Sequence, residues 1–135
     1  TTNEFVPADV VMDFVTKTKI DALAVAAGTG HGTVKGMGGL NIARLAELSN
    51  AVDVPLVLHG GSKLSREDCR LVIDNGIAKI NIATDMSLSA ADRLRTELAK
   101  SPSANYIHLM TSVKKGVKDL VRKYMLNFDC ISRAI

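Results

Sequence analysis

The sequence has few aromatic residues: phenylalanine, tyrosine and tryptophan make up 4% of the 135 residues, and tryptophan is absent. A core must therefore come from aliphatic side chains, and a hydrophobic content of 47% is enough for a globular domain. No apolar run is long enough to span a bilayer, and no secretory signal pattern is present. The two cysteines, Cys69 and Cys130, match neither a metal-binding spacing nor a disulfide framework. They suit a reducing environment, so a cytoplasmic protein without a membrane partner is predicted.

Concentrated positive charge is also lacking, since the formal net charge is only +3. The basic face of the last predicted helix is interpreted as solvated because no aromatic residue interleaves with it. That face holds Lys114, Lys115, Lys118, Arg122 and Lys123. There is no GxGxxG or P-loop pattern and no Ser-His-Asp or Cys-His arrangement. Nucleic-acid binding, nucleotide binding and nucleophilic catalysis are therefore disfavoured.

Short apolar segments alternate with helical patterns along the chain. Parallel strands are predicted over residues 22–27, 54–58 and 78–82. Helices are predicted over residues 7–18, 41–52, 65–76, 84–98 and 109–128. The first helix would bury a stripe formed by Val10, Val11, Phe14 and Val15. Three strands, each followed by a helix, predict an α/β fold with a parallel sheet, in either a βα-barrel or a doubly wound arrangement.

Helix ends have recognisable signals. Ser65 and Asp68 form an acidic variant of the capping box, and Gly76 is a natural helix stop. Either Thr84 or Asp85 is expected to cap the helix that follows the third strand.

Three parallel strands alone would leave two open sheet edges, which proteins usually close or cover. The chain also begins with TTNEF and has no initiator methionine. A fragment or processed product, forming part of a larger sheet, is therefore expected.

Two histidines lie at equivalent positions, each after a predicted strand and beside glycines. His31 stands in "GTGHGTVKG" and His59 in "LHGGSK". Because neighbouring strands lie about 4.8 Å apart, the two imidazoles are expected to meet at the strand ends. One interpretation is a shared zinc ion; the other is that each imidazole bonds a loop carbonyl. Catalytic zinc normally takes three protein ligands, and His108, near the start of the last helix, is expected at the surface instead.

The glycines beside these histidines favour a phosphate site at the same sheet edge. The backbone N–H groups that could cradle a phosphate are those of Gly32, Gly60, Gly61 and Ser62. Thr84 in "NIATD" would add a hydroxyl and a helix N-terminus, and Lys35 would add a positive charge. The alternative is that these glycines serve tight turns only.

Taken together, "LAVAAGTGHGTVKG", "VPLVLHGGSKL" and "AKINIATD" resemble the class II, zinc-dependent fructose-bisphosphate aldolase family, nearest its branch of tagatose- and related ketose-bisphosphate aldolases. The order and spacing of the three motifs match, and the resemblance covers nearly the whole chain. It implies a TIM (β/α)8 barrel, of which residues 1–135 would be the C-terminal part: the last three βα units and the C-terminal helices, without the N-terminal half.

The resemblance also implies roles for individual residues. His31 and His59 fall on zinc-ligand positions. Positions that hold the substrate's phosphate and hydroxyls are matched by Gly32, Gly60, Gly61, Ser62, Asn81 and Thr84, with Lys35 matching a lysine after the HG pair. In the family, zinc polarises the carbonyl of dihydroxyacetone phosphate and stabilises its enediolate, and a monovalent cation, Na+ or K+, often assists.

Two departures from the family pattern stand out. Lys63 replaces a usual glycine, which implies strain if φ is positive and added positive charge if it is not. The remaining zinc histidine and the catalytic aspartate belong to earlier strands, and this chain has no matching residue. Asp21 precedes its strand, and Asp85 belongs to the phosphate loop.

The predicted function is that of a lyase of glycolysis or related carbohydrate metabolism. The complete protein would reversibly cleave a ketose 1,6-bisphosphate to dihydroxyacetone phosphate and an aldehyde, as a homo-oligomer without a nucleic-acid partner, while this chain alone would be inactive. The alternative is a non-catalytic phosphosugar-binding or assembly subunit that a partner chain completes.

Overall fold

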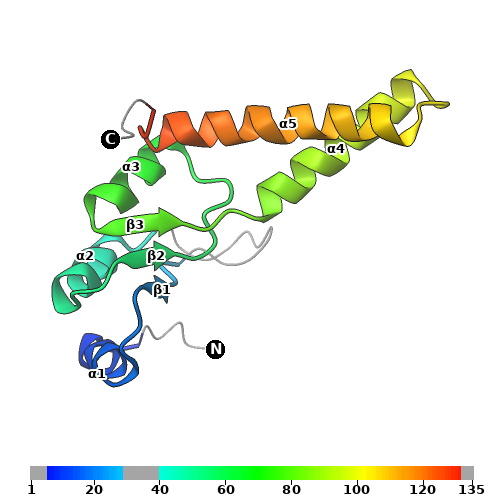
Figure 1. The fold of residues 1–135 in the computed structure, drawn as a ribbon. Coiled ribbons are helices and arrows are strands. Elements are labelled where there is room, and N and C mark those ends of the chain that lie inside the picture. The colour runs from blue at the N-terminus through cyan, green and yellow to red at the C-terminus, as the bar shows by residue number, and fades with distance from the viewer. Residues whose placement is uncertain (1–5, 29–39, 132–135) are drawn as a thin grey trace.

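The computed structural model describes residues 6–28 and 40–131. Helices and strands follow one another in the predicted order (Figure 1). In chain order they are α1 (Ala8–Thr18), β1 (Leu23–Val25), α2 (Ile42–Ala51), β2 (Leu56–Leu58), α3 (Arg66–Asp74), β3 (Ile77–Ile80), α4 (Thr84–Lys100) and α5 (Tyr106–Asn127). The strands are shorter than predicted, and α5 begins earlier because the Asn105 side chain accepts a hydrogen bond from the backbone N–H of His108 and so caps it.

The strands form a parallel sheet in the order β1-β2-β3. β2 is central and buried along its whole length, whereas Ala24 in β1 and Ala78 and Lys79 in β3 are exposed. The α/β class and the parallel sheet are therefore confirmed. The continuously apolar segment at residues 22–27 favoured burial on both faces of that strand, but only β2 is buried along its whole length.

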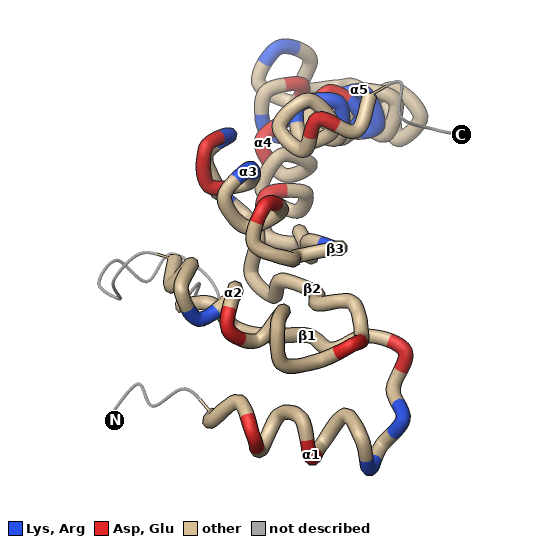
Figure 2. The backbone as a smooth tube through the Cα atoms, turned by 90° about the vertical axis from the view of Figure 1, so that its left-hand side faces the viewer, with Lys and Arg blue, Asp and Glu red and all other residues tan. Residues whose placement is uncertain are grey.

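The core is aliphatic, as the scarcity of aromatic residues required. It joins the sheet to α2 and α3 and consists of Val25, Ala27, Leu45, Leu48, Leu56, Leu58, Val72 and Ile77. Charged residues gather on the helices and their connections (Figure 2). The predicted burial of the α1 stripe is only partial: Val11 packs against the core, but Val10 is 50% and Phe14 49% exposed.

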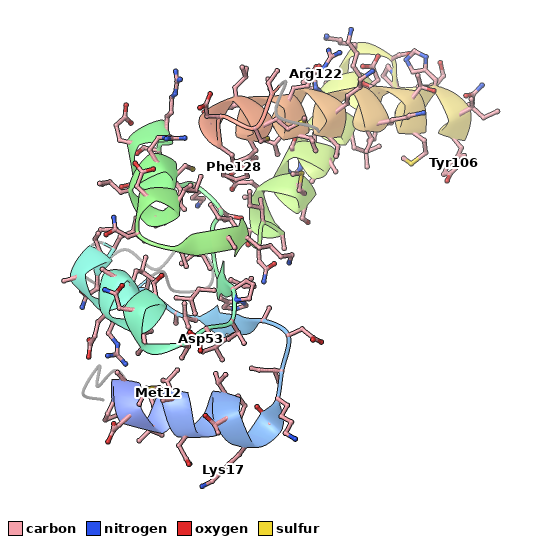
Figure 3. The ribbon with its side chains drawn as sticks, turned by 60° about the vertical axis from the view of Figure 1, so that its left-hand side comes forward. Met12, Lys17, Asp53, Tyr106, Arg122 and Phe128 are labelled. Carbon is pink, nitrogen blue, oxygen red and sulfur yellow. The ribbon has the colours of Figure 1, made fainter. Side chains whose placement is uncertain are left out.

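α4 and α5 lie side by side as a long hairpin that extends beyond the sheet (Figure 1). Near its far end, Glu97 accepts hydrogen bonds from Ser112 and His108, at 2.9 Å each, and these bonds lower the pKa of the Glu97 carboxyl. His108 is exposed, as predicted. The predicted basic residues of α5 are also exposed, and Figure 3 shows Arg122 among them and Tyr106 at the far end.

The helix-end signals are confirmed at one helix and wrong at another. Ser65 Oγ accepts from the backbone N–H of Asp68 at 3.0 Å, and Asp68 Oδ2 accepts from that of Ser65 at 3.1 Å, which completes the capping box of α3. α4, in contrast, begins after Ala83 without a side-chain cap. Neither Thr84 nor Asp85 caps it, because both lie inside the first turn, and Asp85 bonds elsewhere.

Candidate functional site

The segments that follow the strands are joined at the carboxyl edge of the sheet. The backbone N–H of His59 donates to the carbonyl of Val25 at 3.0 Å, and that of Asn81 donates to the carbonyl of Leu58 at 2.9 Å. These bonds continue the parallel ladder one residue past β2 and β3. The half-buried His59 therefore lies directly beside the end of β1, where the sequence predicted a ligand site.

Two loops at this edge are hydrogen-bonded to each other, and we call them the glycine loop (residues 60–63) and the α4 entry (residues 81–85). The backbone N–H of Gly61 donates to the carbonyl of Asn81 at 2.9 Å. The backbone N–H of Asp85 donates to Ser62 Oγ at 3.3 Å. The structure thus brings together five of the residues predicted to hold phosphate: Gly60, Gly61, Ser62, Asn81 and Thr84.

The other predicted site residues lie outside the described ranges: His31, Gly32 and Lys35. The expected meeting of His31 with His59 therefore stays a prediction. Within residues 6–28 and 40–131, no group of three histidine, cysteine or acidic residues is placed to hold a metal ion.

Only some backbone N–H groups of the glycine loop donate hydrogen bonds to other described residues. That of Gly61 is bonded to Asn81, so the role of this N–H in a phosphate site stays a prediction. A Cβ on Gly61 would lie 2.1 Å from Ile80 Cγ2, which shows that glycine is needed there for close packing. Among the described residues, the N–H groups of Gly60 and Ser62 donate to no other group. These two could bind an anion together with the first turn of α4, where the Asp85 N–H is already bonded to Ser62 Oγ but no side chain caps the helix.

Lys63 occupies the left-handed region, with φ of 66°. The strain that the sequence implied for a positive φ at this position is therefore present. The backbone N–H of Lys63 donates to Asp85 Oδ2 at 2.9 Å and to the Tyr124 hydroxyl oxygen at 3.3 Å. These bonds hold a turn that an L-residue otherwise disfavours.

Lys63→Gly is expected to stabilise the protein by about 1 kcal/mol, because glycine adopts a positive φ without the Cβ clash. Lys63→Ala is the matched control, since it removes the side chain but keeps the Cβ, and it should give no comparable gain. Urea unfolding of the three proteins compares their free energies of unfolding. Equal stability of the glycine and alanine variants would contradict strain at this position.

Tyr124 is a residue of this site that sequence reasoning missed. It comes from α5, is 6% exposed, and donates a hydrogen bond from its hydroxyl to Asp85 Oδ2. Its ring is buried, with its centroid 5.7 Å from that of Phe128. The polar end of the side chain gave no sequence signal, because its partners are 39 and 61 residues away.

Burial, with the hydrogen bond to Asp85, raises the pKa of Tyr124 to about 12. Because the folded-state pKa is above the unfolded value of about 10, the stability that Tyr124 contributes is complete below pH 10 and is lost as pH rises through 12.

In a Tyr106→Phe variant, Tyr124 is the remaining tyrosine. We expect tyrosinate absorbance to titrate near 12 in the folded variant and near 10 in urea. Titration near 10 in both states would contradict the buried bond to Asp85.

The parallel sheet and the two edge loops show an α/β protein whose candidate site lies at the carboxyl ends of the strands. The family described as Fructose-bisphosphate aldolase class-II matches residues 3–133. The chain belongs to this family, which confirms the resemblance of its three motifs.

Similar proteins and solved structures that are named as aldolases support the family assignment. The chain is 44% identical over 119 residues to "D-tagatose-1,6-bisphosphate aldolase subunit GatY" of Klebsiella oxytoca, covering 87% of this chain and 42% of the relative. Among solved structures, the YdjI aldolase from Escherichia coli K12 is 33% identical with a TM-score of 0.84, over 98% of this chain and 48% of that one. A putative fructose-1,6-bisphosphate aldolase from Coccidioides immitis is 28% identical with a TM-score of 0.80, over 90% and 42%. The chain therefore spans less than half the length of these relatives.

The helices offer no membrane-spanning candidate: none in the described part of the chain is both long and apolar enough to cross a bilayer.

Proposed function

We propose that residues 1–135 are the C-terminal part of a TIM (β/α)8 barrel, and that the complete protein is a metal-dependent ketose-bisphosphate aldolase. The family assignment, the sequential parallel order β1-β2-β3 and the length of the relatives support this proposal. In a closed barrel, β1 and β3 would each pair with a further strand, which removes the two sheet edges.

The proposed reaction is the reversible cleavage of a ketose 1,6-bisphosphate to dihydroxyacetone phosphate and an aldehyde. The observation that carries it is the junction of the glycine loop with the α4 entry, one residue after His59. This junction gathers anion-binding backbone groups beside a potential metal ligand. The name of the Klebsiella relative favours a tagatose-type substrate, and the name of the family favours a fructose-type substrate.

The donor chemistry of the strand ends fits zinc. His59 lies beside the end of β1 through its backbone bond to Val25, and the sequence places His31 in the segment after β1. These two imidazoles would hold the ion, which when bound would polarise the substrate carbonyl. A third ligand and the proton-transferring aspartate would come from earlier strands of the complete barrel. A monovalent cation, Na+ or K+, beside the glycine loop is part of the same proposal.

The phosphate would be held by this chain's own groups. The N–H groups of Gly60 and Ser62 and the first turn of α4 supply donors, and the Thr84 hydroxyl adds one more. Gly32 and Lys35 would complete this set. The side-chain NH2 of Asn81 would donate to a substrate hydroxyl, while its Oδ1 accepts from Lys79 Nζ and its backbone carbonyl keeps the two loops together.

His59→Ala should lower zinc occupancy in the complete protein and reduce cleavage of the ketose bisphosphate by about 100-fold, because a direct metal ligand is lost. Thr84→Ala should leave zinc in place and raise the KM for the bisphosphate. His108→Ala, an exposed histidine of α5, is the matched control and should change neither quantity. Zinc analysis and steady-state kinetics distinguish the three variants. Full zinc occupancy and activity in His59→Ala would overturn the metal assignment.

The alternative, a non-catalytic phosphosugar-binding or assembly subunit, has support in the word "subunit" in the Klebsiella relative's name. It predicts phosphosugar binding without cleavage unless a second chain is added. Assembly of the complete protein into a homo-oligomer and its location in the cytoplasm stay predictions.

A further inference from the structure

We propose that Tyr124 and Asp85 are positioning residues that set the conformation of the glycine loop for phosphate binding. This inference rests on the proposed function, and it links the last helix to the ligand loop. Nothing in the sequence motifs suggests such a link, because Tyr124 lies on α5, 61 residues after Lys63.

Three atoms from three separate elements form a closed hydrogen-bonded group. They are the backbone nitrogen of Lys63, Asp85 Oδ2 and the Tyr124 hydroxyl oxygen. Lys63 donates to both oxygens, at 2.9 and 3.3 Å, and the Tyr124 hydroxyl donates to Asp85. The Tyr124 ring is buried beside Phe128, so α5 supplies a rigid support for its hydroxyl.

The two residues on either side of Ser62 are tied down by this network. The backbone N–H of Gly61 is bonded to Asn81, and that of Lys63 is bonded to Asp85 and Tyr124. The direction of the intervening Ser62 N–H is therefore fixed by partners on both sides. Gly60 and Lys63 both have positive φ, of 79° and 66°, and lysine at such a φ relaxes when its N–H is released.

The charge of Asp85 gives a second reason for this assignment. A carboxylate beside a phosphate site would repel the ligand unless its charge were engaged by other groups. Asp85 Oδ2 accepts hydrogen bonds from Lys63 and from Tyr124, and the backbone N–H of Asp85 reaches Ser62 Oγ. Asp85 thus acts on the glycine loop and not on the phosphate directly.

Tyr124→Phe in the complete protein tests the inference, because it keeps the buried ring and removes only the hydroxyl. We expect the KM for the bisphosphate, and the inhibition constant of inorganic phosphate, to rise about tenfold with kcat within about twofold. Tyr106→Phe, at a side chain 75% exposed, is the matched control. A purely structural role would lower the active fraction, and hence the apparent kcat, with KM unchanged.

Two further variants sharpen this test. Lys63→Gly placed in the Tyr124→Phe background should recover part of the phosphate affinity, because glycine adopts the positive φ without strain after the bond from the residue-63 N–H to the Tyr124 hydroxyl is lost. Asp85→Asn keeps the side-chain size and should raise the same two constants as Tyr124→Phe, so it serves if that variant does not fold.

Unchanged KM and phosphate inhibition in both Tyr124→Phe and Asp85→Asn would overturn the inference alone. A wild-type protein that neither cleaves the bisphosphate nor binds phosphate would overturn this inference together with the proposed function.

Discussion

Replacing Gly61 by alanine is expected to destabilise the protein by about 3 kcal/mol, at the upper end of the cost of overpacking. The new Cβ would lie 2.1 Å from Ile80 Cγ2 and 3.2 Å from the carbonyl oxygen of Asn81. Neither group can move freely, because Ile80 belongs to β3 and the Asn81 carbonyl accepts the bond from the Gly61 N–H. The glycine loop and β3 would have to separate, which also breaks the junction at the candidate site.

A double-mutant cycle identifies the cause of this loss. Ile80→Ala removes Cγ2, so the loss caused by Gly61→Ala should be clearly smaller in the Ile80→Ala background than in the wild type. Urea unfolding measures the four free energies of unfolding. Additive effects, or a Gly61→Ala variant within about 0.5 kcal/mol of wild type, would contradict the close packing.

Leu58→Ala is expected to cost about 4 kcal/mol, because Leu58 is fully buried at the end of the central strand. The cavity would open between β2 and the helices that cover it, one residue before His59. Leu126→Ala, at a side chain 58% exposed on α5, is the matched control and should cost less than 1 kcal/mol. Equal losses of stability in the two variants would contradict a core centred on β2.

The sequence predicts the α/β class and the order of elements because periodicity and helix signals are local properties. The capping box at Ser65 is an example: its two partners are three residues apart, and both bonds are present. The predicted cap at Thr84 or Asp85 is wrong because distant contacts outweigh the local preference. Local preference favoured a cap, but a distant tyrosine and the glycine loop take the Asp85 carboxylate instead.

Part of the candidate site could also be predicted, since parallel strands place their carboxyl ends at one edge. That rule correctly brought Ser62 and Asn81 to the same edge. It could not show that the Gly61 N–H serves Asn81, nor that Tyr124 completes the group around Lys63. Both depend on tertiary contacts between segments far apart in the chain.

Aldol cleavage by the complete protein, measured with and without a metal chelator, tests whether the protein is a metal-dependent aldolase. Fructose 1,6-bisphosphate and tagatose 1,6-bisphosphate are supplied in turn, and release of dihydroxyacetone phosphate is followed. We predict cleavage of at least one substrate, its loss on removal of the metal, and its return on addition of zinc. Phosphosugar binding without cleavage in any metal state, or cleavage that a chelator leaves untouched, would contradict the proposed metal-dependent aldolase.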